Sequence, residues 1–241
     1  MYCINTWLCY YLNVKIQNSL LKFYDIMLNN ILRLIYPSFC RSCTSIIDQE
    51  QTFCFSCQSK IKPVVPVFLA LTKKYTLPIH AACAYEDPIK SLILKKFSHD
   101  TLACKQLANL MIDFVPFDAI KADFLIPIPL HWSRFAWRGY NQADLIAKQL
   151  SKKIGVPTLN IVKRKRRTIF QSRLRTDQRQ KNVENVFSIK KNFILNNPIK
   201  DKNIVIIDDL FTTGATVKSI AKTLSTLQPA SISIAVACRT I

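Results

Sequence analysis

The chain has 241 residues, of which 49% are hydrophobic, and 34 Lys and Arg against 15 Asp and Glu give a formal net charge of +19. This length predicts one domain of about 150–200 residues with a small appendage. The charge favours polyanionic ligands such as phosphates, nucleic acid or acidic membrane surfaces, although a solubilising coat of Lys would give the same total. No segment approaches the roughly 18 uninterrupted apolar residues of a transmembrane helix, which excludes that class.

The first 36 residues are rich in apolar and aromatic side chains. Between residues 20 and 35 these side chains recur at helical spacing, which predicts a helix that packs on the protein or adheres to a surface. Another hypothesis is that translation begins at Met27, so that residues 1–26 are spurious or dispensable. The start of the chain lacks the basic segment and the small-residue cleavage site of a signal peptide.

Residues 37–62 contain an internal repeat, in which FCRSC is followed by FCFSC. Two Cys-x-x-C pairs on tight turns would place four thiolates as tetrahedral Zn²⁺ requires, and metal binding would supply the folding energy of so small a segment. Two redox dithiols, or disulfides in an oxidising compartment, are the alternatives. Nine Cys at uneven spacing favour a reduced, cytoplasmic protein with a metal site. The predicted zinc ligands are Cys40, Cys43, Cys54 and Cys57.

The five remaining cysteines lie in mostly apolar contexts and are predicted to be small core residues. They are Cys3, Cys9, Cys83, Cys104 and Cys238.

The next part of the chain predicts the first elements of an α/β domain. Asp87 and Pro88 form a cap and a first helical residue, and Asp100 begins another helix. The expected elements are a linker or cover strand over 61–78, a short strand over 80–85, helices over 87–97 and from 100 onward, and a strand over 124–128.

The segment that follows reads LHWSRFAWRGYNQA and contains no acidic residue. We expect a loop here, and then a helix over 142–154 that ends at Gly155. Ligands of open α/β sheets bind beyond the carboxyl ends of the strands, so Arg134 and Arg138 are candidates for binding pyrophosphate. An exposed basic loop without a ligand is the alternative. His131 could be catalytic, although a lone His in a loop is more often incidental.

The most basic stretch lies between residues 163 and 187, after an expected strand over 158–162 and before a short strand over 187–189. It could be a mobile loop that closes over a phosphorylated substrate, a surface that follows the phosphates of a nucleic acid, or a solvated run of charge. Phe170 is the only aromatic residue inside the run, so base stacking is weakly supported there.

The most informative stretch, IVIIDDLFTTGAT, spans residues 204–216. Its four β-branched residues predict a strand buried on both faces, and a helical pattern covers 217–227. The turn between them would cradle an anion, because N–H groups at a helix N-terminus and three Thr hydroxyls would point at it. An ordinary strand–helix turn with two solvated acids is the alternative. The candidate site residues are Asp208, Asp209, Thr212, Thr213, Gly214, Ala215 and Thr216.

This stretch resembles the PRPP-binding signature of type I phosphoribosyltransferases: four apolar residues, two acids, two mostly apolar positions and a Thr-Thr-Gly-x-Thr loop. With the cysteine repeat, RGYNQA and the basic segment containing Gln171 and Asn182, residues from about 31 to 239 resemble the ComF family of competence proteins. The resemblance implies a type I phosphoribosyltransferase fold, a mostly parallel twisted sheet flanked by helices, behind a four-cysteine zinc module.

The resemblance also implies roles for these residues. Asp208 and Asp209 would hold the ribose hydroxyls and the metal-bound substrate, residues 212–216 would cradle the 5-phosphate, and Arg134 and Arg138 would take the pyrophosphate end. Residues 164–182 would form a flexible lid. Mg²⁺ would bridge pyrophosphate oxygens, and the zinc would be structural.

Two functions follow from these assignments. The first is a phosphoribosyltransferase-like protein that binds PRPP and Mg²⁺ and has a role in natural competence and DNA uptake. If it is an enzyme, a nucleophilic nitrogen would displace pyrophosphate from C1 of PRPP. The second is a non-enzymatic competence factor whose phosphate cleft and basic loops bind single-stranded DNA or a partner protein. The expected domains are a helical extension (1–36), the zinc module (37–62) and the phosphoribosyltransferase-like domain (63–241).

Overall fold

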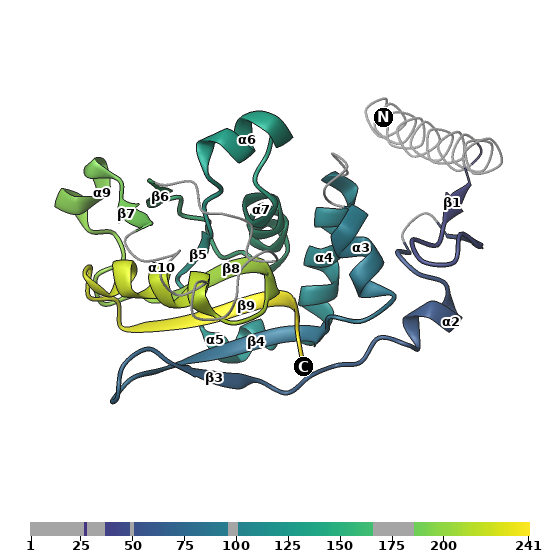
Figure 1. The fold of residues 1–241 in the computed structure, drawn as a ribbon, viewed down its shortest axis with the longest axis horizontal. Helices are drawn as coiled ribbons and strands as arrows, with labels where there is room; N and C mark the ends of the chain where they lie inside the picture. Colours follow the sequence, from purple (N-terminus) through teal and green to yellow (C-terminus); the bar gives the residue numbers. More distant parts are fainter. Residues whose placement is uncertain (1–26, 28–36, 49–50, 96–100, 166–185) are drawn as a thin grey trace, which may run out of the picture. The chain divides into compact units, whose positions relative to one another are not determined.

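The computed structural model describes residues 27, 37–48, 51–95, 101–165 and 186–241 (Figure 1). The expected helix over residues 20–35 therefore lies outside the described residues except for Met27, as does most of the basic segment. The chain divides into two compact units, residues 1–58 and 59–241. Among the described helices, none has the length and apolarity needed to span a membrane.

The first unit is built around the cysteine repeat. Strand β1 (Ser38–Phe39) pairs antiparallel with β2 (Ile46–Ile47), and the short helix α2 (Phe55–Gln58) follows. Its described residues bury only three side chains, those of Cys40, Phe53 and Cys57.

The second unit contains a five-stranded sheet in the order β3-β4-β9-β8-β5. All neighbouring pairs are parallel except the edge pair of β3 and β4. A mostly parallel sheet is thus confirmed. The strands are β3 (Val67–Ala70), β4 (Thr76–Ala84), β9 (Ser231–Arg239), β8 (Asn203–Phe211) and β5 (Phe124–Pro127).

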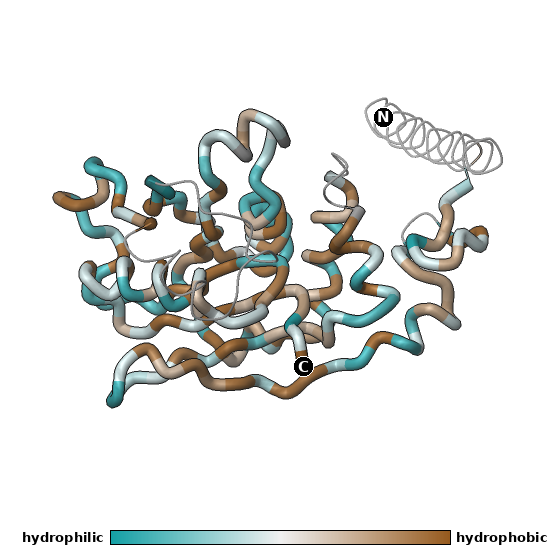
Figure 2. Tube along the Cα trace, in the orientation of Figure 1, coloured by the Kyte–Doolittle hydropathy of each residue, from teal (hydrophilic) through white to brown (hydrophobic). Residues whose placement is uncertain are grey.

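Strand β8, which lies between β9 and β5, carries the β-branched run, and all four of its residues 204–207 are fully buried, as predicted. Ile204 and Ile206 pack in one hydrophobic cluster with Val217 and Ile220 of helix α10 (Ala215–Ser225). Helices α4 (Thr101–Phe114) and α7 (Gln142–Ile154) pack against each other and against strands of the same sheet. Figure 2 shows hydrophobic residues concentrated on the central strands. The remaining helices of this part of the chain include α3 (Ile89–Lys95) and α5 (Phe117–Ile120).

The helix predicted over 142–154 is confirmed at both ends. Gly155 adopts φ +75° and its N–H donates to the Ser151 carbonyl at 3.0 Å. The Pro-rich segment 61–78 is not only a linker, because it contains edge strand β3 and the beginning of β4. The strand expected over 158–162 is wrong in its bounds. Leu125 exchanges hydrogen bonds with Pro157 and Leu159 in a single parallel bridge, and pairing does not continue.

Strand β6 (Val162–Arg164) instead pairs antiparallel with β7 (Phe187–Ile189) in a separate two-stranded sheet. These two strands bracket the basic segment. Helix α9 (Lys191–Asn196) was not predicted, because its six residues have no buried side chain and hence no apolar period.

Candidate active site and candidate metal centre

The two acids of the signature lie on strand β8 itself rather than after its end. Pairing with β9 continues past them to Phe211 and Arg239, and Thr240 N–H donates to the Phe211 carbonyl at 3.0 Å. Because β9 is as long as β8, the strand extends four residues beyond its apolar run. Asp209 N–H donates to Asp208 Oδ1 at 3.0 Å, which orients the first carboxylate.

A hollow of about 90 Å³ lies where β8 turns into α10. It brings together most of the predicted residues of this turn and adds three apolar ones that the motif did not mark as functional. Its lining is Asp208, Leu210, Phe211, Thr212, Gly214, Ala215, Thr216 and Val217. Asp209 and Thr213 are not part of this lining, and Thr213 is exposed.

Gly214 is required where this turn meets the helix. Its φ is +73°, and α10 begins at the next residue. A Cβ at this position would lie 2.9 Å from Leu69 Cδ2 and 3.0 Å from Phe211 Cε2. Side chains of β3 and β8 therefore pack against the turn at Gly214, which lines the hollow together with Ala215, the first residue of α10.

The segment expected to be a loop contains helix α6 (Trp132–Arg138). His131 caps its N-terminus, since its Nδ1 accepts from Ser133 N–H at 3.3 Å, and Gly139 closes it with φ +75° and an N–H bond to the Phe135 carbonyl. The sequence analysis missed this helix, although the residue that caps its C-terminus, Gly139, is a common helix stop signal. His131 is buried and serves as this cap, a structural role.

Helix α6 and the hollow both lie at the carboxyl ends of the parallel strands. Strand β5 is parallel to β8 with Pro127 beside Ile207, and Ile128 N–H donates to the Ile207 carbonyl at 3.0 Å. The chain therefore leaves the sheet toward α6 one strand away from Asp208. Arg134 and Arg138 lie on α6, and their side chains are outside the described atoms.

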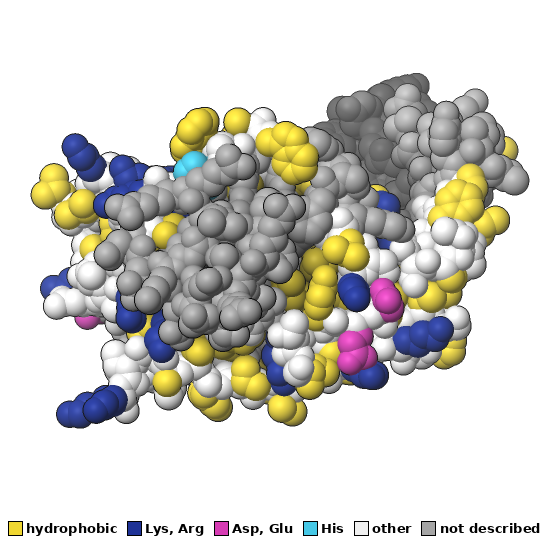
Figure 3. Space-filling model, viewed as in Figure 1, with side chains coloured by type: hydrophobic (Ala, Val, Ile, Leu, Met, Phe, Trp, Pro, Cys, Tyr) yellow, Lys and Arg dark blue, Asp and Glu magenta, His cyan; other side chains and the backbone are white. Residues whose placement is uncertain are grey.

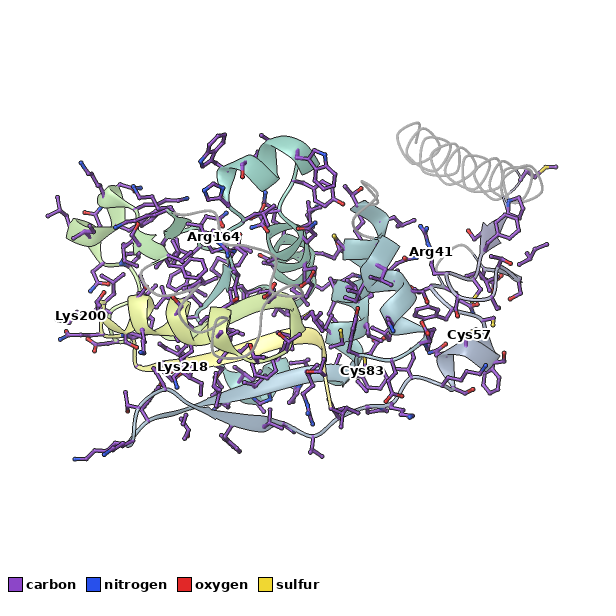
Figure 4. The ribbon with its side chains drawn as sticks, viewed as in Figure 1. Arg41, Cys57, Cys83, Arg164, Lys200 and Lys218 are labelled. Atoms are coloured by element: carbon purple, nitrogen blue, oxygen red, sulfur yellow. The ribbon has the colours of Figure 1, made fainter. Side chains whose placement is uncertain are left out.

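Strands β6 and β7 adjoin the two ends of the basic segment in the chain. Arg164 on β6 lies with its guanidinium carbon 5.4 Å from the centroid of the Phe187 ring on β7 (Figure 4). The predicted lid residues of this segment from 166 onward lie outside the described residues. Elsewhere on the visible face, Lys and Arg side chains are scattered rather than gathered into one patch (Figure 3).

In the first unit, the four predicted cysteines form one cluster in which all sulfur atoms lie within 4.8 Å of one another. Tetrahedral Zn–S bonds of about 2.3 Å give sulfur–sulfur distances of about 3.8 Å, so the cluster fits a zinc module. The Cys43 and Cys54 sulfurs are 3.5 Å apart. Turns position them: Thr44 N–H donates to the Cys40 carbonyl at 3.0 Å, and Cys57 N–H to the Cys54 carbonyl at 3.0 Å.

Two thiols of this cluster, those of Cys54 and Cys57, ionise at different pH. A hydrogen bond with Ser45 is the main cause that lowers the pKa of Cys54 to about 5, whereas desolvation raises the pKa of Cys57 to about 11. Outside the cluster, Cys83, Cys104 and Cys238 are buried, as predicted for core cysteines. Burial raises the pKa of Cys83 to about 12, so this thiol stays protonated.

Comparison with known proteins identifies the class of domain. Residues 138–241, which contain β8, the hollow and α10, match the phosphoribosyl transferase domain. A structure of glutamine PRPP amidotransferase from B. subtilis matches 57% of this chain and 26% of its own at 16% identity and a TM-score of 0.38. A purine phosphoribosyltransferase from Pyrococcus horikoshii covers 58% and 72% at 21% identity and a TM-score of 0.31.

Relatives that match a longer part of the chain show to which family it belongs. DNA utilization protein YhgH of Escherichia coli O157:H7 is 34% identical over 169 residues, 65% of this chain and 70% of that protein. Competence protein F of Haemophilus influenzae is 36% identical over 151 residues, 59% and 64% of the two chains. Competence protein ComFC of Bacillus subtilis is 28% identical over 227 residues, 79% and 90%. The chain belongs to the ComF family of phosphoribosyltransferase-like proteins.

Proposed function

We propose that this protein binds PRPP with Mg²⁺ in the hollow at the end of β8 and acts in the handling of DNA during natural competence. The observation that carries the proposal is the arrangement of one carboxylate, two Thr residues and a glycine-led helix start around a single hollow. Names of the relatives support the second half, since they are competence and DNA utilization proteins.

The proposed division of labour follows the chemistry of PRPP. The N–H groups at the helix start and the hydroxyls of Thr212 and Thr216 would donate hydrogen bonds to the 5-phosphate, because N–H groups and the helix dipole favour a doubly charged anion. The carboxylates of Asp208 and Asp209 would accept hydrogen bonds from the two ribose hydroxyls. Arg134 and Arg138 would bind the pyrophosphate, since they belong to α6, which follows the carboxyl end of β5, the strand next to β8.

Metal ions would complete the two sites. Mg²⁺ suits carboxylate and phosphate oxygens, so Asp208 and Asp209 would hold the Mg²⁺-bound substrate, and the ion would neutralise charge on the pyrophosphate. The four cysteines would hold a structural zinc ion. If a nitrogen nucleophile displaced pyrophosphate at C1, the two carboxylates would stabilise the positive charge that develops on the ribosyl group.

Calorimetry with PRPP and Mg²⁺ tests the proposal. Asp208→Asn should weaken PRPP binding about tenfold or more, because a charge-assisted hydrogen bond to a ribose hydroxyl is lost. Asp201→Asn is a matched control: Asp201 is exposed, lies before β8 and is outside the hollow. Equal affinities of both variants and the wild type would exclude the ribose contact.

The net charge of +19 favours a second function, a non-enzymatic competence factor that binds single-stranded DNA through its basic loops. The two functions separate in one pair of titrations. Absence of any heat with PRPP, together with oligonucleotide binding that weakens steeply with salt, would replace the first function by the second.

A further inference from the structure

Helix α6 presents large aromatic side chains to solvent. Trp132 is 72% exposed, Phe135 50% and Trp137 65%. Every residue of this helix whose side chain is described is half-buried or exposed. Large exposed apolar groups that gather on one element mark an interaction surface.

Hydrogen bonds fix helix α6 at both of its ends. His131 and Gly139 cap the two ends of α6, and Asn141 Nδ2 donates to the Ile128 carbonyl at 2.9 Å. That bond joins the residue where the chain leaves the sheet to the residue where α7 begins. The ring of His131 also lies against Trp132, with centroids 5.6 Å apart. The aromatic side chains therefore belong to a segment whose two ends are joined by a hydrogen bond.

The chemistry around the aromatic side chains selects the partner. The chain has no acidic residue between 124 and 143, and Arg134 and Arg138 belong to the same helix. The three exposed large side chains are aromatic rather than aliphatic. Flat π-systems beside cationic residues are what proteins use to bind single-stranded nucleic acid, in which bases stack on the rings and phosphates meet the cations.

We propose that α6 is a base-stacking surface for single-stranded DNA, with Trp132 and Trp137 as its main contacts and Phe135 as a further one. Stacking does not distinguish sequences, because every base has a π-face, so the surface would bind strands of any sequence. The inference refines the proposed role in DNA handling and rests on that role, but it does not depend on PRPP binding. It also assigns the stacking contacts to α6 rather than to the basic segment 163–187.

The test is a titration of the full chain with a fluorescently labelled single-stranded oligonucleotide and with an abasic oligonucleotide of the same length. The wild type should bind the normal strand more tightly, and the fluorescence of its Trp residues should be quenched. Trp132→Ala with Trp137→Ala should lower affinity for the normal strand about tenfold or more and leave the abasic strand unaffected. The slope of log affinity against log salt should not change, because the phosphate contacts remain.

Phe68→Ala is the matched control, since Phe68 is an exposed aromatic residue (71%) on edge strand β3. Its affinity for DNA should equal that of the wild type. The proposal is overturned if the double variant binds the normal strand like the wild type, or loses affinity equally for the abasic strand. It is also overturned if the Trp fluorescence responds to anionic lipid vesicles and not to DNA.

Calorimetry with PRPP on the same double variant separates this proposal from the proposed function. Retained PRPP binding with unchanged DNA binding refutes only the stacking surface. Weakened DNA binding by the double variant, when the wild type itself gives no heat with PRPP, supports the stacking surface and refutes only the PRPP site. Circular dichroism verifies that the double variant is folded. A variant with Phe instead of Ala at position 132 should bind the normal strand more tightly than the double Ala variant, because a phenyl ring can still stack.

Discussion

At the residue scale, Gly214 couples the conformation of the signature loop to the packing beneath it. Gly214→Ala would force a Cβ into a backbone with φ +73° and within 2.9 Å of Leu69 Cδ2. We expect the free energy of unfolding to fall by about 1–2 kcal/mol from the left-handed backbone alone, with a further loss from the steric contact. Urea denaturation measures both.

Gly155→Ala isolates the first contribution, the cost of the left-handed backbone. Gly155 has nearly the same φ, +75°, and a Cβ there would meet nothing within 4 Å. The variant should therefore show the backbone cost only. If the two substitutions destabilise the protein equally, the contacts with Leu69 and Phe211 do not constrain the loop.

A second residue-scale prediction concerns His80 on β4. Burial lowers the pKa of His80 below its ordinary value of 6.5, and its buried Nδ1 has no hydrogen-bond partner among the described residues. When pH falls through 6.5, the unfolded chain binds a proton that the folded chain resists, so folding loses stability. At pH 8 both states are neutral and nothing is lost.

His80→Gln removes this titration and should make the free energy of unfolding less sensitive to pH between 8 and about 5.5. Denaturant midpoints across that range give the comparison, in which all other titrating groups cancel. Parallel pH profiles for wild type and variant would show that His80 has the same pKa in both states.

At the element scale, Asn141 ties α6 to the sheet. Asn141→Asp keeps the size of the side chain and its suitability as a helix N-cap, but it cannot donate the 2.9 Å bond to the Ile128 carbonyl. We expect faster amide exchange over residues 132–138 and a loss of about 1 kcal/mol in stability. Exchange within α7 should stay slow. Unchanged exchange in α6 would mean that its caps suffice.

The sequence predicted the elements whose periodicity and stop signals agree. Helix α7 has a clear apolar face and Gly155, and the run 204–207 is β-branched throughout, so both were found. Helix α6 was missed because its apolar residues face solvent, which removes the periodicity that marks a packed helix. The four-cysteine cluster followed from spacing alone. Its neighbour Ser45, which lowers the pKa of Cys54, became visible only in three dimensions.

The extent of β8 shows a further limit. The sequence ends its apolar run at Ile207, but pairing with β9 carries the strand to Phe211. Strand length depends on the partner strand, which lies more than twenty residues away in the chain. The consequence for the site is direct, because Asp208 and Asp209 sit on a hydrogen-bonded strand instead of in a loop and are held accordingly.

At the scale of the whole molecule, the two units differ in the interactions that can stabilise each of them. The second unit has a five-stranded sheet with an extensive apolar core, whereas the described part of the first buries only Phe53 besides two cysteines. Burial of one large side chain contributes about 2–3 kcal/mol, far below the roughly 10–16 kcal/mol that a structural zinc ion supplies. Metal should therefore determine folding of the first unit and not of the second.

Cys54→Ser tests this directly. Removing one thiolate should abolish bound metal, measured by elemental analysis, and amide exchange over residues 37–58 should become fast. Exchange in α7 and β8 should remain slow, and a strong chelator should reproduce the pattern in the wild type. Cys104→Ala, a change at a buried cysteine of α4 outside the cluster, should leave the metal content unchanged. Loss of protection throughout the second unit on chelation would show that the two units fold as one.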